Sequence, residues 1–224
     1  MGIGSRSEIK KFLKTCRVKL NGKFEKSSNT QVDIDKDEIL FDDEIVIYKE
    51  FTYLMLNKPK DYISATFDPK LPTVLELLEF PYSNMELFPV GRLDIDTTGF
   101  LILTNDGKFS YNVTNPKKKV NKKYLVTLRD DISSNQIESL ENGIYFEKED
   151  FTTENAKVEE ISKREIYLTI SEGKFHQVKR MLEYVGNEVV ELKRVSIGNL
   201  SLDEKLELGE YREITNTELE EIFK

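Results

Sequence analysis

The sequence predicts an α+β protein with a mixed, largely antiparallel sheet flanked by helices. Short segments that read as strands outnumber the segments with helical periodicity. Most connections between the expected strands are also too short to contain the crossovers that parallel strands need. The chain has 224 residues, which suits one large domain or two unequal ones.

Residues 1–50 predict a small unit with one helix and several short strands. Ser5 and Glu8 have the spacing of a capping box, which indicates a helix over residues 5–16. Asn21-Gly22 is a strong hairpin signal between two alternating segments. We expect further strands at 31–35 and 43–48, and residues 48–51 as the linker to a second domain.

Residues 51–224 alternate strands and helices. The expected strands cover 52–59, 61–66, 86–91, 99–106, 122–128, a hairpin within 156–173, 188–198 and 209–215. The expected helices cover 72–80, 134–143, 174–186 and 216–224. Gly143 and Gly186 are expected to close the second and third of these helices.

The composition excludes several classes of protein. Cys16 is the single cysteine and His176 the single histidine, so a disulfide framework and a Cys-rich or His-rich metal centre are excluded. The N-terminus lacks an apolar signal core, and no apolar stretch approaches the length of a membrane span. These features predict a cytoplasmic protein that does not enter a membrane.

Basic residues are segregated, although the net charge is −8. Seven lie within residues 1–23 against the single acid Glu8, namely Arg6, Lys10, Lys11, Lys14, Arg17, Lys19 and Lys23. Six lysines lie within residues 108–123, which contain no acid. Each run is also consistent with an ordinary solvated face. Together they allow contact with a polyanion, because phosphates respond to the local field.

A polar loop with two aspartates, "GRLDIDTTG" at 91–99, precedes an apolar segment. Asp94 and Asp96 are compatible with a phosphatase that forms an aspartyl-phosphate on Mg²⁺, but no later acidic cluster completes such a site. An aspartic protease would need a second copy of the motif. The alternative without function is an Asx-turn in which Asp96 and Thr97 bond the local backbone.

The complete stretch "GRLDIDTTGFLILTNDG" resembles the central motif of the pseudouridine synthases, in particular the RsuA branch, which modifies ribosomal RNA. Three further segments, "LNKPKDYISAT", "KKYLVTL" and "LTISEGKFHQVKRML", resemble other motifs of that branch in the same order. "DIDTTG" together with "SEGKFHQVKRM" is most similar to the members that act on small-subunit (16S) RNA.

This resemblance implies two domains. Residues 1–50 are similar to the S-four-like RNA-binding module of the branch, without its usual opening helix, which would lie before Gly2. Residues 51–224 are similar to the catalytic domain. The implied reaction detaches uracil from C1′ of its ribose, rotates it and rejoins it through C5. It needs neither a cofactor nor a metal.

The resemblance also assigns roles. Asp94 matches the essential aspartate, Lys179 its basic partner, and Tyr124 the tyrosine on which the flipped base stacks. Arg92 matches a position that fills the space left by the flipped base, and we expect His176 around Lys179. The remaining expected RNA contacts are Ser5, Arg6, Lys10, Lys11, Arg17, Lys23, Lys58, Lys118, Lys122, Gln177 and Arg180.

The implied partner is ribosomal RNA, either naked or within a partly assembled small subunit, and we expect a monomer. A non-catalytic RNA-binding assembly factor with the same fold is the principal alternative. An intact Asp94 disfavours it.

Overall fold

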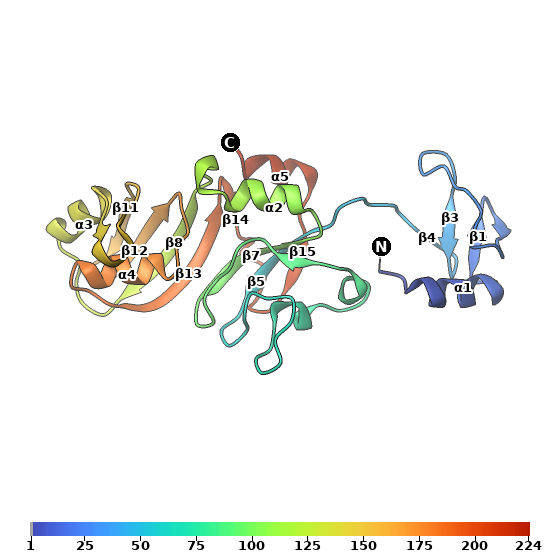
Figure 1. The fold of residues 1–224 in the computed structure, drawn as a ribbon, viewed down its shortest axis with the longest axis horizontal. Helices are drawn as coiled ribbons and strands as arrows, with labels where there is room; N and C mark the ends of the chain where they lie inside the picture. The colour runs from blue at the N-terminus through green and yellow to red at the C-terminus, as the bar shows by residue number, and fades with distance from the viewer. Residues whose placement is uncertain (1) are drawn as a thin grey trace.

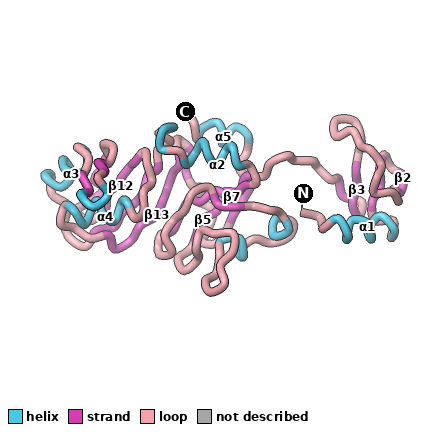
Figure 2. Tube along the Cα trace, in the orientation of Figure 1, coloured by secondary structure: helices cyan, strands magenta, loops and turns pink. Residues whose placement is uncertain are grey.

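The computed structural model describes residues 2–224, apart from the side chain of Lys148. An extended segment joins a small N-terminal unit to a larger body (Figure 1). Strands form the centre of both parts, and loops extend from one side of the larger body (Figure 2). None of the helices in the described residues is long and apolar enough to cross a membrane.

The N-terminal unit is one helix on a small antiparallel sheet. Its elements are α1 (Arg6–Lys14), β1 (Val18–Leu20), β2 (Lys23–Phe24), β3 (Ile39–Phe41) and β4 (Glu44–Ile45), with the strand order β2-β1-β3-β4. The capping box at Ser5 and the hairpin at Asn21-Gly22 are confirmed. The strand expected at 31–35 is wrong, because the carbonyl of Asp33 accepts bonds from the backbone amides of Lys36 and Asp37 in a tight turn.

The larger body contains eleven strands and four α-helices. The strands are β5 (Tyr53–Lys58), β6 (Phe88–Pro89), β7 (Thr98–Thr104), β8 (Lys122–Leu128), β9 (Tyr145–Phe146), β10 (Phe151–Thr152), β11 (Lys157–Ser162), β12 (Glu165–Ile170), β13 (Val189–Ile197), β14 (Leu200–Ser201) and β15 (Tyr211–Glu213). The helices are α2 (Gly107–Thr114), α3 (Ser134–Glu141), α4 (Gln177–Tyr184) and α5 (Asn216–Glu221). Short 3₁₀ turns cover Val74–Leu77, Tyr82–Asn84, Pro116–Lys118 and Glu147–Glu149.

The main sheet of the body has nine strands in a mixed arrangement. Its path runs β11-β12-β8-β13-β7-β5-β15, with β6 added to β7 and β14 to β13. Only the β13–β7 pair is parallel within the described residues. The predicted mixed, largely antiparallel sheet with flanking helices is therefore confirmed.

Gly99 allows the close approach of the two strands at this parallel junction. Its φ is +101°, and a Cβ there would lie 2.2 Å from the carbonyl oxygen of Arg194. A side chain at this position would separate β7 from β13. The glycine that ends the loop motif is therefore required where the two halves of the sheet meet.

The two faces of the sheet bury different side chains. Met55, Phe100 and Ile102 pack under α2 and α5 on one face. The alternate residues of β5 and β7 face the opposite side and join a larger cluster, which continues through β8 and β12 to α4. The loop that carries Asp94 lies over this second face, since Leu93 belongs to the larger cluster.

Two elements predicted for the larger body are wrong, and helix α2 and the short strands β9, β10 and β14 were not predicted. Residues 61–66 form no strand; Ile63 makes an isolated bridge to Thr73. The helix expected over 72–80 is reduced to the 3₁₀ turn Val74–Leu77, after which Leu78 is already extended. Helix α2 was not expected, and the side chain of Asp106 caps its first turn.

Candidate active site

The loop with Asp94 faces the start of helix α4 across a small pocket of about 60 Å³. The pocket is lined by Arg92, Leu93, Asp94, Thr97, Tyr124, Ile170, Gly173, Lys174, His176, Gln177, Val178, Lys179 and Leu192. These residues come from the loop before β7, from β8, β12 and β13, and from the segment leading into α4. Three separate motifs of the sequence therefore converge at one place.

A tight turn presents the side chain of Asp94. The backbone amide of Thr97 donates to the carbonyl of Asp94 at 3.1 Å, so residues 94–97 form a β-turn directly before β7. The hydroxyl of Ser64 accepts a bond from the amide of Leu93 and donates to its carbonyl, at 3.0 and 3.1 Å. The segment after β5, which was expected to be a strand, thus holds the Asp94 loop through the side chain of Ser64.

Lys58 holds the Asp94 loop from the protein interior. Its side chain is fully buried, and its Nζ donates to the carbonyls of Pro59, Asp94 and Thr97 at 2.9–3.1 Å. Burial lowers the pKa of Lys58 to about 8, although Asp96 and Asp94 partly offset the effect. The expected RNA contact of Lys58 is therefore wrong, because its ammonium group is enclosed by the turn that it supports.

Two cationic or potentially cationic side chains approach the carboxylate of Asp94. His176 Nε2 lies 3.4 Å from Oδ1, and Lys179 Nζ lies 3.4 Å from Oδ2. The carboxylate is partly exposed, so it is reachable from the cleft. Each oxygen of the Asp94 carboxylate therefore faces a basic side chain, and a carboxylate is a group that acts as a nucleophile or base in catalysis.

Asp96 takes the shorter contacts with Lys179. Lys179 Nζ lies 2.6 and 2.8 Å from the two carboxylate oxygens of Asp96. Burial alone would raise the pKa of Asp96, but its bonds with Lys179 outweigh that effect and hold the pKa below its usual value. The sequence suggested only a turn function for Asp96, whereas the structure joins it to the basic partner of Asp94.

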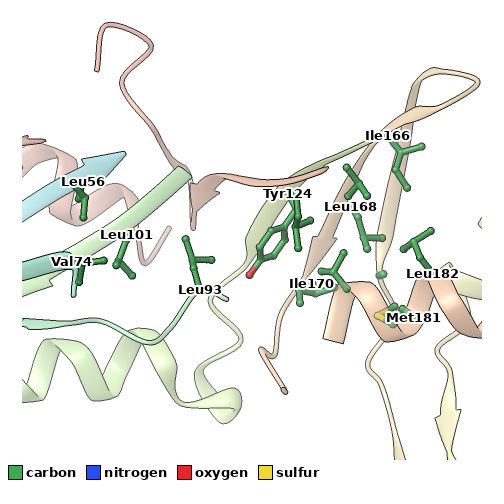
Figure 3. Close-up of a cluster of buried hydrophobic side chains, with 14 of the residues drawn as sticks. Leu56, Val74, Leu93, Leu101, Tyr124, Ile166, Leu168, Ile170, Met181 and Leu182 are labelled. Atoms are coloured by element: carbon green, nitrogen blue, oxygen red, sulfur yellow. The ribbon is translucent and has the colours of Figure 1, made fainter. Parts of the chain in front are cut away.

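Tyr124 forms one wall of the pocket. It is almost completely buried on β8 and belongs to the larger hydrophobic cluster. Figure 3 shows its ring between Leu93 on one side and Leu168 and Ile170 on the other, with the hydroxyl directed toward the side of Leu93. The ring and the Asp94 carboxylate therefore line the same pocket, and the stacking role of Tyr124 stays a prediction.

Arg92 is exposed at the edge of the pocket, two residues before Asp94. Among the described residues it forms no salt bridge. The ion pair that would explain it without function is thus absent from the described part of the chain, and its guanidinium faces solvent beside the carboxylate.

Two further expected RNA contacts have buried side chains, and their contact with RNA stays a prediction. Gln177 lines the pocket, where its side-chain NH₂ group donates to the buried carboxylate of Glu172 and its side-chain oxygen accepts from the backbone amide of Lys174. Lys122 lies inside the sheet beside Arg194 and Glu172, and burial lowers its pKa to about 8. Both side chains support the site from within.

Two other residues are accessible but lie away from the pocket. Arg180 pairs with Glu149 at 2.8 Å and lies over the ring of Phe146. Lys118 lines a separate cavity between α2 and the C-terminal residues, on the opposite face of the sheet. Neither shares a contact with Asp94, so any contact with RNA would lie outside the reacting centre.

The basic residues of the N-terminal unit are exposed. Arg6, Lys10, Lys11 and Lys23 face solvent. Ser5 uses its hydroxyl to cap α1. Arg17 pairs with Asp42 and lies over the rings of Phe12 and Phe41, which pack against each other, so its first function is structural. Lys10 and Lys11 therefore remain the best-placed contacts for a phosphate backbone.

Sequence reasoning did not identify the functions of Lys58, Ser64 and Asp96. The position of Lys58 directly before Pro59 in the first motif was the available signal for the first of them. Its burial depends on carbonyls 36 to 39 residues away, which periodicity does not reveal. Among the described residues, no group of three or more His, Cys, Asp or Glu side chains is arranged to hold a metal ion.

The arrangement defines an enzyme site built around one carboxylate with basic partners and a tyrosine wall. Comparison with known proteins identifies the class. The model of a family described as RNA pseudouridylate synthase matches residues 52–184, and the chain belongs to this family. It is therefore an RNA pseudouridine synthase, an isomerase of uridine in RNA.

Relatives match almost the entire chain. An uncharacterized RNA pseudouridine synthase, YtzG of Bacillus subtilis, is 48% identical and covers 97% of this chain and 92% of its own length. Ribosomal small subunit pseudouridine synthase A of Haemophilus influenzae is 42% identical and covers 98% and 94%. A crystal structure of a pseudouridylate synthase is 41% identical, with a TM-score of 0.73 and coverage of 97% and 94%.

Proposed function

We propose that the enzyme converts a specific uridine of small-subunit (16S) ribosomal RNA to pseudouridine, with Asp94 as the essential catalytic residue. The observation that carries this proposal is the carboxylate of Asp94 with His176 Nε2 and Lys179 Nζ each at 3.4 Å, beside the ring of Tyr124. The ribosomal target is supported by relatives named small subunit pseudouridine synthase A, which match nearly the whole chain.

The reaction requires an ionised carboxylate next to the target nucleotide. The bond between N1 of uracil and C1′ breaks, the base rotates, and C5 bonds to C1′; the proton lost from C5 is balanced by one gained at N1. Asp94 acts on C1′, on the base or on the C2′ proton, and all three alternatives use its charged form. Lys179 and His176 lie beside that carboxylate.

The target uridine must leave the RNA stack before its C1′ becomes accessible. The pocket of about 60 Å³ is small compared with the ~300–1,000 Å³ of typical ligand sites, so it corresponds to the bottom of a cleft that RNA completes. Tyr124 provides the flat face for the flipped base, and Arg92 extends from the rim toward the space that the base vacates.

The N-terminal unit docks the substrate in this proposal. We assign residues 1–50 to an S-four-like RNA-binding module and residues 51–224 to the catalytic domain. No sheet contains strands of both parts, and residues 46–52 between them form neither helix nor strand. Exposed Lys10 and Lys11 of α1 contact phosphates, which position the protein without reading the sequence. The enzyme acts as a monomer in the cytoplasm, on free RNA or on a partly assembled subunit.

The alternatives fit the site less well. A magnesium-dependent phosphatase needs carboxylates free to bind the cation, but Asp94 and Asp96 both face Lys179. A non-catalytic assembly factor would have no need to keep a reachable carboxylate with basic partners beside a rigid tyrosine.

The test is chemical mapping of pseudouridine in ribosomal RNA from cells with and without the gene. We expect one small-subunit position to lose its modification in the deletion strain. The parental gene should restore it and the Asp94→Asn gene should not. Unchanged small-subunit RNA would contradict the target, and restoration by Asp94→Asn would contradict the catalytic residue.

A further inference from the structure

An exposed phenylalanine lies between two residues, Lys174 and His176, that line the pocket. Phe175 belongs to the segment between β12 and α4, and 69% of its surface is accessible to solvent. One exposed apolar side chain is common in folded proteins and needs no explanation by itself. Phe175 differs from the other exposed aromatic residues through its direct connection to the catalytic carboxylate.

This connection is a stack of two rings. The rings of Phe175 and His176 are stacked, with centroids 3.7 Å apart and planes inclined by 19°. His176 Nε2 in turn lies 3.4 Å from Oδ1 of Asp94. The exposed face of Phe175 therefore continues a stack that begins at the reacting centre.

The backbone holds these rings in an unusual conformation. His176 has φ +49° and ψ +31°, in the left-handed region that residues with a Cβ seldom occupy. It is the N-cap of α4, yet its side chain makes no capping bond. Gln177 fixes the turn by two hydrogen bonds with Lys174. Its side-chain oxygen accepts from the backbone amide of Lys174, and its backbone amide donates to the carbonyl of Lys174. The turn thus presents the two rings to the cleft.

Cationic side chains line the pocket beside the stack. Arg92, Lys174 and Lys179 are among its lining residues. Such a rim attracts phosphates from both sides of a nucleotide held at Asp94. A flat apolar face between cationic side chains is the combination by which proteins hold single-stranded nucleic acid.

We propose that Phe175 is the stacking platform for the nucleobase next in sequence to the target uridine. The target base lies against Tyr124 in the pocket, while its neighbour rests on the outer face of Phe175. Aromatic stacking tolerates all four bases, so this subsite requires a neighbouring base without selecting its identity. The inference rests on the proposed function of the same pocket.

The test measures stacking directly with 2-aminopurine, a base whose fluorescence falls when it stacks on an aromatic ring. Short RNAs containing the mapped target uridine carry the probe on its 5′ or its 3′ side, and binding is measured in the Asp94→Asn background so that no turnover occurs. We expect quenching in one of the two RNAs. Quenching should persist with Phe175→Tyr and be lost with Phe175→Ala.

The affinity for the unlabelled RNA should change in parallel. Loss of one stacked base, worth ~1–3 kcal/mol, corresponds to binding about 5- to 150-fold weaker for Phe175→Ala. An RNA with an abasic neighbour should bind parent and Phe175→Ala equally. Tyr184→Ala is the matched control, because Tyr184 lies on α4 with 61% of its surface exposed and its ring packs against Phe146 rather than against a residue that lines the pocket.

The kinetic result separates this inference from the proposed function. In the enzyme with intact Asp94, Phe175→Ala should raise KM by a larger factor than it lowers the single-turnover rate at saturating enzyme. Quenching that survives Phe175→Ala, or equal losses of affinity on intact and abasic RNA, would overturn the inference alone. A parental enzyme that forms no pseudouridine in any ribosomal RNA would overturn the proposed function.

Discussion

Lys179 lies closer to Asp96 than to Asp94, the residue proposed to be catalytic. Its Nζ is 2.6 Å from the nearer oxygen of Asp96 and 3.4 Å from Oδ2 of Asp94. One ammonium group therefore bridges the two aspartates of the motif. The unequal distances give each aspartate a distinct expected phenotype.

Asp94→Asn should abolish isomerisation while leaving folding and RNA binding nearly intact. An amide keeps the shape of the side chain but acts neither as nucleophile nor as base. The measurement is single-turnover pseudouridine formation, with the thermal midpoint as a control for folding. A rate within tenfold of the parent would contradict the assignment.

Asp96→Asn should slow the same step by about 10- to 100-fold, a smaller loss than Asp94→Asn causes. Without the Asp96 carboxylate, Lys179 loses its closest partner and shifts relative to Asp94, and misplacement of this kind costs up to about 100-fold. The comparison uses saturating enzyme. An unchanged rate would return Asp96 to a turn function, whereas complete loss would give it an equal part in the chemistry.

Lys58→Met should destabilise the protein by about 3 kcal/mol at neutral pH. Methionine fills the volume but leaves buried carbonyls without their donor, at ~1–3 kcal/mol each before relaxation. Urea unfolding measures the loss. Lys163→Met, at an exposed lysine, is the control and should change stability little.

The deficit of Lys58→Met should grow as the pH rises above 8. The pKa of Lys58 is about 8 in the folded protein and 10.5 ordinarily, so between these values the unfolded chain binds the additional proton. Stability conferred by the group then increases with pH, by up to about 1.4 kcal/mol per unit. A deficit that stays constant from pH 7.5 to 9.5 would show that Lys58 keeps its charge.

Substitutions at Tyr124 should separate stacking from the function of its hydroxyl. Tyr124→Phe keeps the ring and should be clearly slowed in the chemical step if the hydroxyl assists proton transfer. Tyr124→Ala should be slower still, because it removes the stack and leaves a cavity in the cluster around Leu168 and Ile170. A Phe variant at the parental rate would remove the hydroxyl from the mechanism, and an Ala variant at that rate would remove the residue from the site.

Removing the charges of Lys10 and Lys11 together should weaken RNA binding and flatten its salt dependence. The slope of log affinity against log salt should fall by about 1.4 to 1.8, at ~0.7 per single-stranded and ~0.9 per duplex phosphate contact. Lys157 and Lys163, on the β11–β12 hairpin at the far end of the sheet, provide the control pair (Figure 1). Equal slopes in both double variants would mean that α1 faces away from the RNA.

Local signals were sufficient for elements whose stabilising contacts are local. Helix α1 carries its own capping box, and the β11–β12 hairpin and β8 carry clear alternation. Helix α2 lacked such a signal, because "GKFSYNVT" combines glycine with β-branched and polar residues of low helix propensity. Burial of Phe109 and Val113 under the sheet makes it helical, and that contact is not visible in the sequence.

The residues that line the pocket were predictable from the sequence, but the buried residues that hold them in place were not. The motif resemblance named Arg92, Asp94, Tyr124, His176 and Lys179, and the structure brings all five to one pocket. A lysine in a sequence is normally expected to be exposed, so the burial of Lys58 and Lys122 was not predicted. Their acceptors come from loops distant in the chain, and only the folded structure shows that a charge there is enclosed.

The parallel junction between β7 and β13 has a consequence for the timing of synthesis. Asp94 lies directly before β7, while β8 with Tyr124 is held beside it through β13, which ends at Ile197. The first strand of the body also pairs with β15, where Tyr211 lies opposite Leu56. A nascent chain therefore carries Asp94, Tyr124 and Lys179 before the strands that hold them together. The site is assembled only after residues through Ile197 and Tyr211 have been synthesised and these long-range pairs have closed.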